Sequence, residues 1–281
     1  MAKLIQYSTR ASQYSGAFDS KVGWAAAGMG YLIVTDGGRL IMIDGGFDED
    51  AEALISLMKE QTGSDKPAVD LWIITHPHGD HYFALRRLAK DDMRSRLSIK
   101  TLAYRFPADF SDRGGNTCEG DARAMKSVGE AFGAVTVTPE IDGHIAIDGL
   151  DLHFLYVPED ASGLNNFNQL SLIFKITGSE RDVMITGDAF HNSLNYVAER
   201  YGEALRSDIL QMPHHGLCDT GHLEFYNLVG AKALLVPTSI AGHRAMHSEL
   251  YGIDSRRANL FAEKNAEKVY NAFEGTVTIE I

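Results

Sequence analysis

A chain of 281 residues with 44% hydrophobic residues can bury a sizeable core, as one large or two small domains. Its formal net charge of -12 argues against broad nucleic-acid binding, which needs lysine and arginine to neutralise phosphates. There are only two cysteines, Cys118 and Cys218, so we expect no disulfide framework. The sequence has no membrane-length apolar run, and its first residues lack the apolar core of a signal peptide. We therefore expect a cytoplasmic protein without membrane contact, or the processed form of a secreted one.

The first predicted elements are two strands joined by a tight turn. Residues 30–46 read GYLIVTDGGRLIMIDGG, in which two apolar runs flank an Asp-Gly-Gly turn, as in a β-hairpin. Asp44 ends the second of these strands. A helix is predicted at 49–62, where apolar residues recur at helical spacing. The four consecutive apolar residues at 71–74 then predict a strand buried on both faces of a sheet.

Strands and helices continue to alternate along the chain, which predicts a mixed α/β fold. The predicted helices are at 82–90, 119–132, 193–201, 222–229 and 257–273, and the predicted strands are at 99–104, 136–137, 152–157 and 276–281. No linker rich in proline, glycine or serine divides the chain, so we expect one domain over residues 1–281. The segment 105–115 is the most loop-like, and its Phe106 and Phe110 could line the mouth of a site or anchor the loop to the core.

The segment 71–81 carries most of the chemistry. It reads LWIITHPHGDH, so three histidines and one aspartate fall within six residues after a buried strand. His76 and His78 are two apart in an extended segment and therefore point to the same side. A proline and a glycine bend the chain there and bring Asp80 and His81 behind them. Nitrogen and oxygen donors at this density suit Zn²⁺ or a similar ion such as Fe, Mn or Co.

The His-x-His-x-Asp-His pattern resembles the signature of the metallo-β-lactamase superfamily. The resemblance implies an α/β fold, a four-layer αββα sandwich with a hydrolytic site for one or two metal ions along its upper edge. Three further places agree. Asp44 matches an aspartate that orients the ligands by hydrogen bonds, and Asp188, at the end of the apolar run DVMITGDA, matches the bridging aspartate. Residues 208–216 read DILQMPHHG, which is similar to the last histidine motif of the family.

In this last motif either His214 or His215 could be the ligand. We favour His215, because the spacing strand-Pro-x-His-Gly resembles the most common form of the motif, and we expect His214 beside the site as a substrate contact or proton donor. The resemblance implies two divalent ions, Zn²⁺ first of all, with Mn or Fe as alternatives. The implied ligands are His76, His78, Asp80, His81, Asp188 and His215.

One histidine that the family usually supplies has no counterpart in this chain. The corresponding stretch, 158–173, reads PEDASGLNNFNQLSLI and contains no histidine. An amide oxygen, such as that of Asn168, is a poor Zn²⁺ ligand compared with imidazole. We therefore expect the first ion, at His76 and His78, to be weakly held, and we assign Asn168 to substrate binding. Cys218 is treated as a small packed residue rather than a ligand.

The missing histidine, together with Asn before Ser-Leu, Thr-Gly-Asp and Pro-His-His-Gly, resembles one branch of the superfamily. That branch contains the hydrolase domain of competence-type DNA-uptake proteins and the phosphorylcholine esterases, and its members act mainly on phosphodiester bonds. Residues 237–250, PTSIAGHRAMHSEL, match a Gly-His of that branch, so His243 and Arg244 are candidate phosphate contacts, although Arg244 could simply be solvated. Two ions would make the pocket locally positive, which favours a small phosphoester over long DNA as the partner.

The resemblance implies metal-activated hydrolysis. Asp80 would ligate and orient a hydroxide, and His214 or His243 would protonate the leaving group. Three alternatives remain: a mono-iron oxygen- or sulfur-transfer enzyme on the same fold, a thioester or lactone hydrolase, and a non-catalytic binding module. The complete His-x-His-x-Asp-His argues against the binding module, because a degenerate scaffold would lose part of it first. The fold alone does not choose among these functions.

Overall fold

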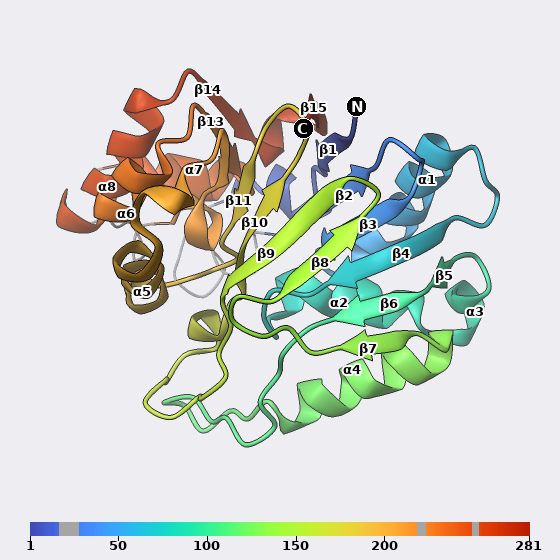
Figure 1. Cartoon of the computed structure of the whole chain (residues 1–281). Coiled ribbons are helices and arrows are strands. Elements are labelled where there is room, and N and C mark those ends of the chain that lie inside the picture. The colour runs from blue at the N-terminus through green and yellow to red at the C-terminus, as the bar shows by residue number, and fades with distance from the viewer. Residues whose placement is uncertain (17–27, 218–222, 249–252) are drawn as a thin grey trace.

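Two β-sheets packed face to face form the centre of the molecule (Figure 1). The structure is a computed structural model that describes residues 1–16, 28–217, 223–248 and 253–281. The strands of the first sheet are β1 (Lys3–Gln6), β2 (Gly30–Val34), β3 (Leu40–Asp44), β4 (Ala68–Ile73), β5 (Ser98–Ile99), β6 (Thr101–Ala103), β7 (Val135–Val137) and β15 (Val277–Glu280). Their order is β15-β1-β2-β3-β4-β6-β7, and β5 pairs with β4.

The second sheet is built from the other half of the chain. Its strands are β8 (His144–Ile147), β9 (Leu150–Tyr156), β10 (Ile173–Thr177), β11 (Val183–Ile185), β12 (Ile209–Gln211), β13 (Ala233–Val236) and β14 (Lys268–Asn271), in the order β14-β13-β12-β11-β10-β9-β8. The strands β11 to β14 are parallel to one another, as are β3, β4 and β6 in the first sheet. Loops after parallel strands leave the same edge of a sheet, so each sheet gathers polar loops along one edge.

Helices cover the outer face of each sheet (Figure 1). On the first sheet they are α1 (Ala51–Thr62), α2 (Gly79–Leu88), α3 (Asp91–Arg94) and α4 (Glu119–Phe132), and in the second half α5 (His191–Tyr201), α6 (Leu223–Val229), α7 (Ile240–Met246) and α8 (Ile253–Asn265). Short 3₁₀ turns are η1 (Arg10–Gln13), η3 (Asp48–Asp50), η4 (Phe167–Leu170), η5 (Gly202–Leu205), η6 (Pro213–Gly216) and η7 (Ala272–Glu274). Among the described helices, none has the length and apolar character needed to cross a bilayer.

Three apolar layers hold the four layers of secondary structure together. The middle layer lies between the sheets and draws on both, with Ile43 and Ile73 from the first and Phe174 and Ile185 from the second, all fully buried. The outer layers join each sheet to its helices, as where Trp72 of the first sheet packs with residues of α1 and α2. The predicted α/β fold and its αββα layering are therefore confirmed.

Most predicted elements agree with the structure, and the exceptions have physical causes. The helix predicted at 119–132 is α4, and that at 49–62 is a 3₁₀ turn followed by α1. The helix predicted at 257–273 is wrong in its second half, because α8 ends at Asn265 and residues 268–271 pair with β13 as a parallel edge strand. Such pairing with a distant strand overrides local helical spacing. The strands β1, β8, β10 and β13 and the helices α3 and α7 were not predicted.

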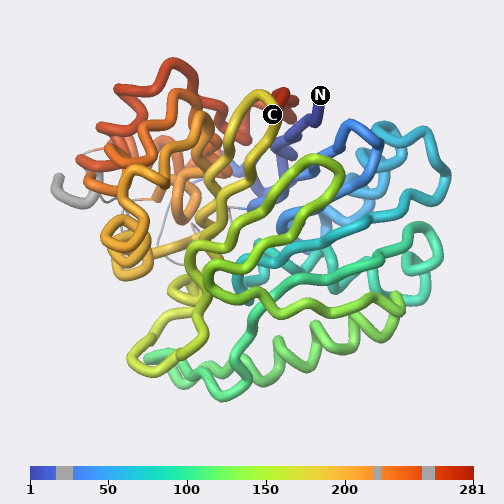
Figure 2. The backbone as a smooth tube through the Cα atoms, viewed as in Figure 1, coloured from blue at the N-terminus to red at the C-terminus, as the bar shows by residue number. Residues whose placement is uncertain are grey.

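The two ends of the described chain lie side by side, as Figure 2 shows. The strands β1 and β15 are antiparallel neighbours, and the backbone N–H of Ile281 donates to the carbonyl oxygen of Ala2 at 3.0 Å. The first sheet therefore takes strands from both ends of the sequence. This closure places both halves of the chain around the same central layer.

Candidate metal centre

The loop after β4 brings the first histidine motif to the edge of the first sheet. His76 is fully buried, and its Nε2 lies 3.1 Å from Nδ1 of His78. His78 is the N-cap residue of α2, so Asp80 and His81 fall in the first turn of that helix. The bend expected at the glycine is therefore a helix start, which turns Asp80 and His81 back toward the two preceding histidines.

A buried carboxylate at the end of β3 fixes this loop. Asp44 has a left-handed backbone with φ 54° and is fully buried. Its carboxylate accepts hydrogen bonds from the backbone N–H and the hydroxyl of Thr75, each at 2.8 Å, and lies 2.7 Å from Nδ1 of His81. Burial raises the pKa of Asp44, opposed by His81 and Thr75. The contact holds the Nδ1 proton of His81 and leaves its Nε2 for a metal ion, as outer partners of metal-bound histidines do.

The second sheet contributes Asp188 from the turn after β11. The Asp188 backbone N–H donates to Oγ of Ser171 at 3.0 Å. The preceding residue, Gly187, has φ 53°, and a Cβ there would lie 3.0 Å from Cβ of Thr75 and 3.1 Å from that of Ser171. Because Thr75 belongs to the loop after β4, the backbone of Gly187 meets a side chain of the other half here, without room for a side chain of its own. A further backbone bond, from Leu172 N–H to the Thr75 carbonyl at 3.0 Å, joins the halves at the same point.

The two adjacent histidines lie in the 3₁₀ turn η6 after β12. Both have left-handed backbones, with φ 50° at His214 and 57° at His215. The His214 N–H donates to the carbonyl oxygen of Gly187 at 3.1 Å, and Nε2 of the Gln211 side chain donates to the same oxygen at 3.0 Å. On the other side, Nδ2 of Asn259 in α8 donates to the carbonyl oxygens of Gly216 and Leu217, at 2.9 and 3.0 Å. The turn is thus tied both to the Asp188 loop and to α8.

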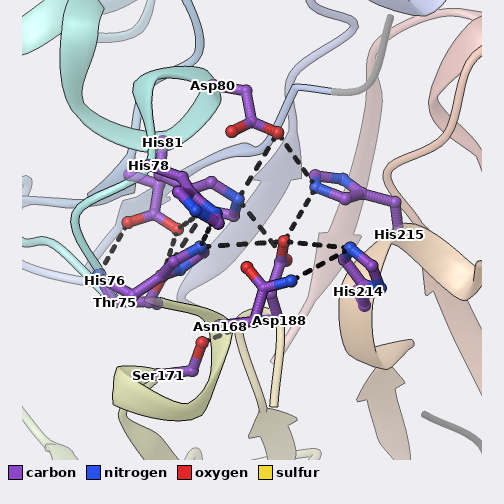
Figure 3. A network of polar contacts seen from close by, with 12 residues as sticks. Thr75, His76, His78, Asp80, His81, Asn168, Ser171, Asp188, His214 and His215 are labelled. Carbon is purple, nitrogen blue, oxygen red and sulfur yellow. Dashed lines mark hydrogen bonds and ion pairs between the residues drawn. The ribbon is translucent and has the colours of Figure 1, made fainter. Parts of the chain in front are cut away.

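The two halves form two groups of donors that share one carboxylate (Figure 3). In the first group, Nε2 of His76 lies 3.7 Å from Oδ2 of Asp188. In the second group, Nε2 of His215 lies 3.1 Å from Asp80 and 3.3 Å from Asp188. The donor atoms of each group lie within 4.8 Å of one another, and the groups are His76, His78 and Asp188, and Asp80, His81, Asp188 and His215.

Several buried polar atoms in these groups lack a hydrogen-bond partner among the described residues: His81 Nε2, His215 Nε2 and Asp188 Oδ1. Buried polar atoms are nearly always satisfied, because an unmade hydrogen bond is costly. Here they converge on one another, and imidazole nitrogens with carboxylate oxygens are ligands that suit Zn²⁺, Fe or Mn. The residues present therefore fit bound divalent metal, which these two groups of donors, sharing Asp188, would hold.

The two groups differ in their protonation without metal. Burial lowers the pKa of His76 well below its ordinary value and also lowers that of His78. Burial acts the same way on His215, but the Asp188 and Asp80 carboxylates outweigh it and raise the His215 pKa to about 10. Burial likewise opposes ionisation of Asp188, yet His215 and His81 hold the pKa of this carboxyl well below its usual range. The first group is neutral at its histidines, and the second is an ion pair.

The other histidine of the adjacent pair stands on the far side of Asp188 from His76 (Figure 3). His214 Nε2 lies 3.9 Å from Oδ2 of Asp188 and 3.2 Å from Nδ2 of Asn168. Burial lowers the pKa of His214 to about 4. The structure therefore brings His215, and not His214, into the second donor group, and it leaves His214 in contact with Asn168.

A cavity of about 380 Å³ opens beside the two groups. It is lined by Phe47, His78, Gly79, Asp80, Asp112, Asn166, Phe167, Asn168 and Asp188. Four of these, Phe47, Asp112, Asn166 and Phe167, were not expected at the site. Nothing in their local sequence marks them, because they reach the cavity only through the packing of loops that are distant in the chain.

Some predicted site residues lie elsewhere. His243 is on α7, where its ring packs 4.2 Å from that of His247 and 5.1 Å from that of Phe273. Arg244 is exposed, with Nη1 3.5 Å from the carbonyl oxygen of Ser15. Neither is among the described residues that line the cavity. Their roles toward substrate stay predictions.

Two aromatic residues of the 105–115 loop anchor it rather than line the cavity. Phe106 packs 5.8 Å from the ring of Tyr82, and Phe110 packs 5.3 Å from that of Phe167. Both are nearly buried. Of the two cysteines, Cys118 is buried beside Phe110, and Cys218 lies outside the described residues.

Comparisons with known proteins agree with this geometry. Residues 26–116 match the family model described as Metallo-beta-lactamase superfamily. The fold is that of the metallo-β-lactamase superfamily. No curated protein matched this metallo-β-lactamase-fold chain by sequence.

Solved structures resemble the metallo-β-lactamase-fold chain over its whole length. Zn²⁺-bound PqqB from Methylobacterium extorquens is 13% identical, with a TM-score of 0.59 and 100% of each chain covered. A diphosphatase from the PhnP family is 15% identical, with a TM-score of 0.51, and the match covers 100% of this chain and 98% of that one. CmlA, a diiron β-hydroxylase from Streptomyces venezuelae, is 12% identical, with a TM-score of 0.55, and the match covers 99% of this chain and 54% of that one. At these identities the likeness concerns the fold.

Proposed function

We propose that this protein is a metal-dependent hydrolase that acts on a small phosphodiester. The observation that carries the proposal is the pair of donor groups sharing Asp188 beside an open cavity. A structural polar cluster would satisfy its own hydrogen bonds. Here three buried donor and acceptor atoms lie within ion-pair distance of one another but make no hydrogen bond among the described residues, and two residues of the groups, His78 and Asp80, also line the cavity.

Divalent ions in these groups would supply an acidified water as nucleophile and would polarise the ester oxygen. The chain's own residues fix the ligands and shape the pocket. Asp80 is held on one side by His215, at 3.1 Å, and remains partly exposed to the cavity, so we propose that it also orients the nucleophile. Asp44 holds His81 in the tautomer that presents Nε2. We propose His214 as a substrate contact or proton donor; burial lowers its pKa to about 4 in the metal-free chain, so its ring is neutral there at pH 7.

The cavity lining supports a phosphodiester rather than a phosphomonoester. None of its described residues is lysine or arginine, and Asp112 adds a carboxylate at the rim. That carboxylate is held in place by the backbone N–H groups of Gly114 and Asn116, each at 2.8 Å. A diester carries one negative charge and a monoester close to two, so the diester is repelled less. Phe47 and Phe167 offer apolar surface that suits an aromatic leaving group.

The iron alternative rests on the same donors, because imidazole and carboxylate also bind iron. Metal analysis of the purified chain separates the two classes. We expect two divalent ions per chain that are Zn²⁺ or Mn²⁺. One tightly bound iron per chain would overturn the hydrolase proposal in favour of oxygen- or sulfur-transfer chemistry.

A substrate panel then tests the reaction. The panel contains bis(4-nitrophenyl) phosphate, 4-nitrophenyl phosphate, a thioester, a lactone and a β-lactam, each with Zn²⁺ and with Mn²⁺. We expect cleavage of the diester, a lower rate on the monoester and negligible β-lactam hydrolysis. Asp80→Ala should lose the diesterase activity. Asp182→Ala is its matched control and should keep the activity, since Asp182 pairs with Lys175 at the surface. Efficient thioester or β-lactam hydrolysis without any diesterase activity would refute the proposal.

Arg244 and His243 remain proposed phosphate contacts from the branch resemblance. If Arg244 binds only the phosphate of the substrate, Arg244→Ala should raise KM more than it lowers kcat. Unchanged kinetics in Arg244→Ala would agree with its exposed position on α7 and remove it from the proposed site.

A further inference from the structure

We propose that Asn168 is a metal ligand, and that its side-chain oxygen takes the fourth position of the first donor group in place of the absent histidine. The inference rests on the proposed metal-dependent function and names one more ligand at the same centre. It changes the role of Asn168 from the substrate contact that the sequence suggested. It also gives His214 a task, which is to orient Asn168.

The first group is one donor short of a tetrahedral ion. It contains two imidazoles and one carboxylate, from His76, His78 and Asp188. The second group contains four donors without any addition. Protein sites for Zn²⁺ and similar ions usually hold four ligands, or three and a water. The fourth donor of the first group must come from the cavity lining or from solvent.

Asn168 has a buried oxygen that nothing else uses. Its side chain is only 1% exposed, and Oδ1 has no hydrogen-bond partner among the described residues. The other atom of the amide, Nδ2, lies 3.2 Å from Nε2 of His214. An amide NH₂ group can only donate, so His214 Nε2 accepts this bond and its proton resides on Nδ1.

That bond fixes the direction of the oxygen. The two branches of an amide point apart, so a nitrogen directed at His214 turns the oxygen away from it. Figure 3 shows the result: the Asn168 side chain lies beside Asp188, with its nitrogen toward His214 and its oxygen on the side of His76. Asn168 also lines the same cavity as His78 and Asp188. The free oxygen therefore faces the donors of the first group.

Several hydrogen bonds fix the backbone of the segment that carries Asn168. The Asn168 N–H donates to Oδ1 of Asn166 at 2.8 Å, and the Asn168 carbonyl accepts from Ser171 N–H at 3.1 Å. Oε1 of Gln169 accepts the N–H groups of Asn165 and Asn166, at 2.8 and 3.1 Å. The turn η4 is thus a rigid base, which positions the amide before any ion binds.

The chemical consequence concerns which ion is bound. With Asn168 the first group has two nitrogen and two oxygen donors, where a third histidine would have given three nitrogens. Neutral oxygen donors favour harder ions such as Mn²⁺, whereas imidazole favours Zn²⁺. We therefore infer that the first group prefers Mn²⁺ more than a three-histidine site would, and that Asn168→His would shift the preference toward Zn²⁺.

The experiment measures metal binding, so it does not depend on any substrate. Mn²⁺ and Zn²⁺ are titrated separately by calorimetry into metal-free chains that carry His215→Ala, which weakens the second group and isolates the first. In this background we compare Asn168→Leu, Asn168→Asp and Asn168→His. Asn165→Leu is the matched control, because Asn165 enters the network through its backbone. The d–d absorption of Co²⁺ reports the donor set independently.

We expect Asn168→Leu to weaken Mn²⁺ binding at least tenfold and Asn168→Asp to retain it, since only the latter keeps an oxygen there. Asn168→His should raise the ratio of Zn²⁺ to Mn²⁺ affinity at least tenfold and alter the Co²⁺ spectrum. Wild-type Mn²⁺ affinity in Asn168→Leu would overturn the assignment, and so would an equal loss in Asn168→Asp, which would mark a structural role. If the binding results hold but no phosphodiester is cleaved, the function fails and the ligand assignment stands.

Discussion

The two halves of the metal centre are built in opposite ways. The half on the first sheet takes its four donors from one stretch of six residues, His76 to His81, and one buried carboxylate, Asp44, fixes it. The half on the second sheet takes its ligands from separate segments, and neutral amides and hydroxyls such as those of Gln211 and Ser171 fix it. The donors of the first half are therefore close in sequence and held by a charged side chain, whereas those of the second half come from separate segments and are held by neutral side chains.

This difference predicts different kinds of failure. Loss of the Asp44 charge should disturb the tautomer and position of a histidine. Loss of a ligand in the second half should remove whole ions, because Asp188 belongs to both donor groups. Variants can therefore test whether the halves are independent.

The largest effect should come from Asp188→Ala, which removes the shared carboxylate. We expect both ions to be lost and the rate to fall by more than the roughly 10–100-fold typical of removing an outer partner. Metal content by mass spectrometry and turnover of the diester check this. Asp182→Ala, at the opposite end of the same strand, should behave as wild type. Retention of two ions by Asp188→Ala would break the assignment of Asp188 as the shared ligand.

Next in size is His215→Ala, which should remove one ion and spare the other. The reason is that His215 is a donor of the second group only, where it lies against Asp80 and Asp188. The neighbouring variant His214→Ala should keep both ions, with weaker binding at the first group. Metal stoichiometry after gel filtration distinguishes the two. If His214→Ala lost an ion outright and His215→Ala did not, the ligand role would pass to His214.

A smaller effect is expected from Asp44→Asn, which keeps the shape and removes the charge. The amide brings an NH₂ group to a place where Thr75 and His81 both offer donors, so metal affinity should fall about 10–100-fold. Calorimetric titration measures the loss. Asp50→Asn is the control, because Asp50 is also buried and accepts backbone N–H groups, from Arg10 and Phe47. Equal metal affinity in the two variants would show that the brace is only structural.

The smallest effect concerns pH and separates the two groups without mutation. A metal ion must displace the His215 proton, whose pKa is about 10, while burial already keeps His76 and His78 neutral. The His215 proton alone should lower affinity at the second group by about tenfold for each pH unit below about 10, and the raised pKa of His81 adds to this loss, whereas affinity at the first group should change less. Titration in buffers of different protonation enthalpy counts the released protons. Equal numbers of protons released at the two groups would contradict the predicted difference in their protonation.

The raised pKa of His215 also predicts how the free energy of unfolding of the metal-free chain changes with pH. His215 has a raised pKa in the folded metal-free chain, so the protonated form stabilises that state fully below pH 6.5. This contribution should be lost as the pH rises toward about 10. Urea unfolding of the metal-free chain at several pH values would show the decline, and His215→Ala should flatten it.

The same contrast explains what could be predicted from the sequence. The first half could be read because its donors lie within six residues after an apolar strand, and Asp44 because it ends the neighbouring strand. For the second half, Asp188 and His215 came from resemblance to known motifs. The role of Thr75, which donates two hydrogen bonds to Asp44, could not be predicted, since a threonine at the end of a strand is common. Phe47 and Asp112 reach the cavity only through long-range packing.

The errors follow the same rule. The helix predicted at 257–273 failed where residues 268–271 pair with β13, a contact that no local pattern contains. The roles given to His243 and Arg244 came from a motif resemblance and stay predictions, since neither residue is among those that line the cavity. Local spacing predicts elements, and only the assembled fold decides which side chains meet.

Gly187 leaves no space for a side chain between the two halves of the centre. Its bare backbone touches Thr75 on one side and Ser171 on the other, so the gap between the half-sites is defined to within a single methyl group. The close approach of the Gly187 main chain to the Thr75 side chain then helps to set the distance between the two loops before any ion binds. The chain bears the cost of bringing the ligands together when it folds. A Gly187→Ala substitution would push the Thr75 and Ser171 segments apart. It would therefore disturb the arrangement of the donors although every donor residue is still present.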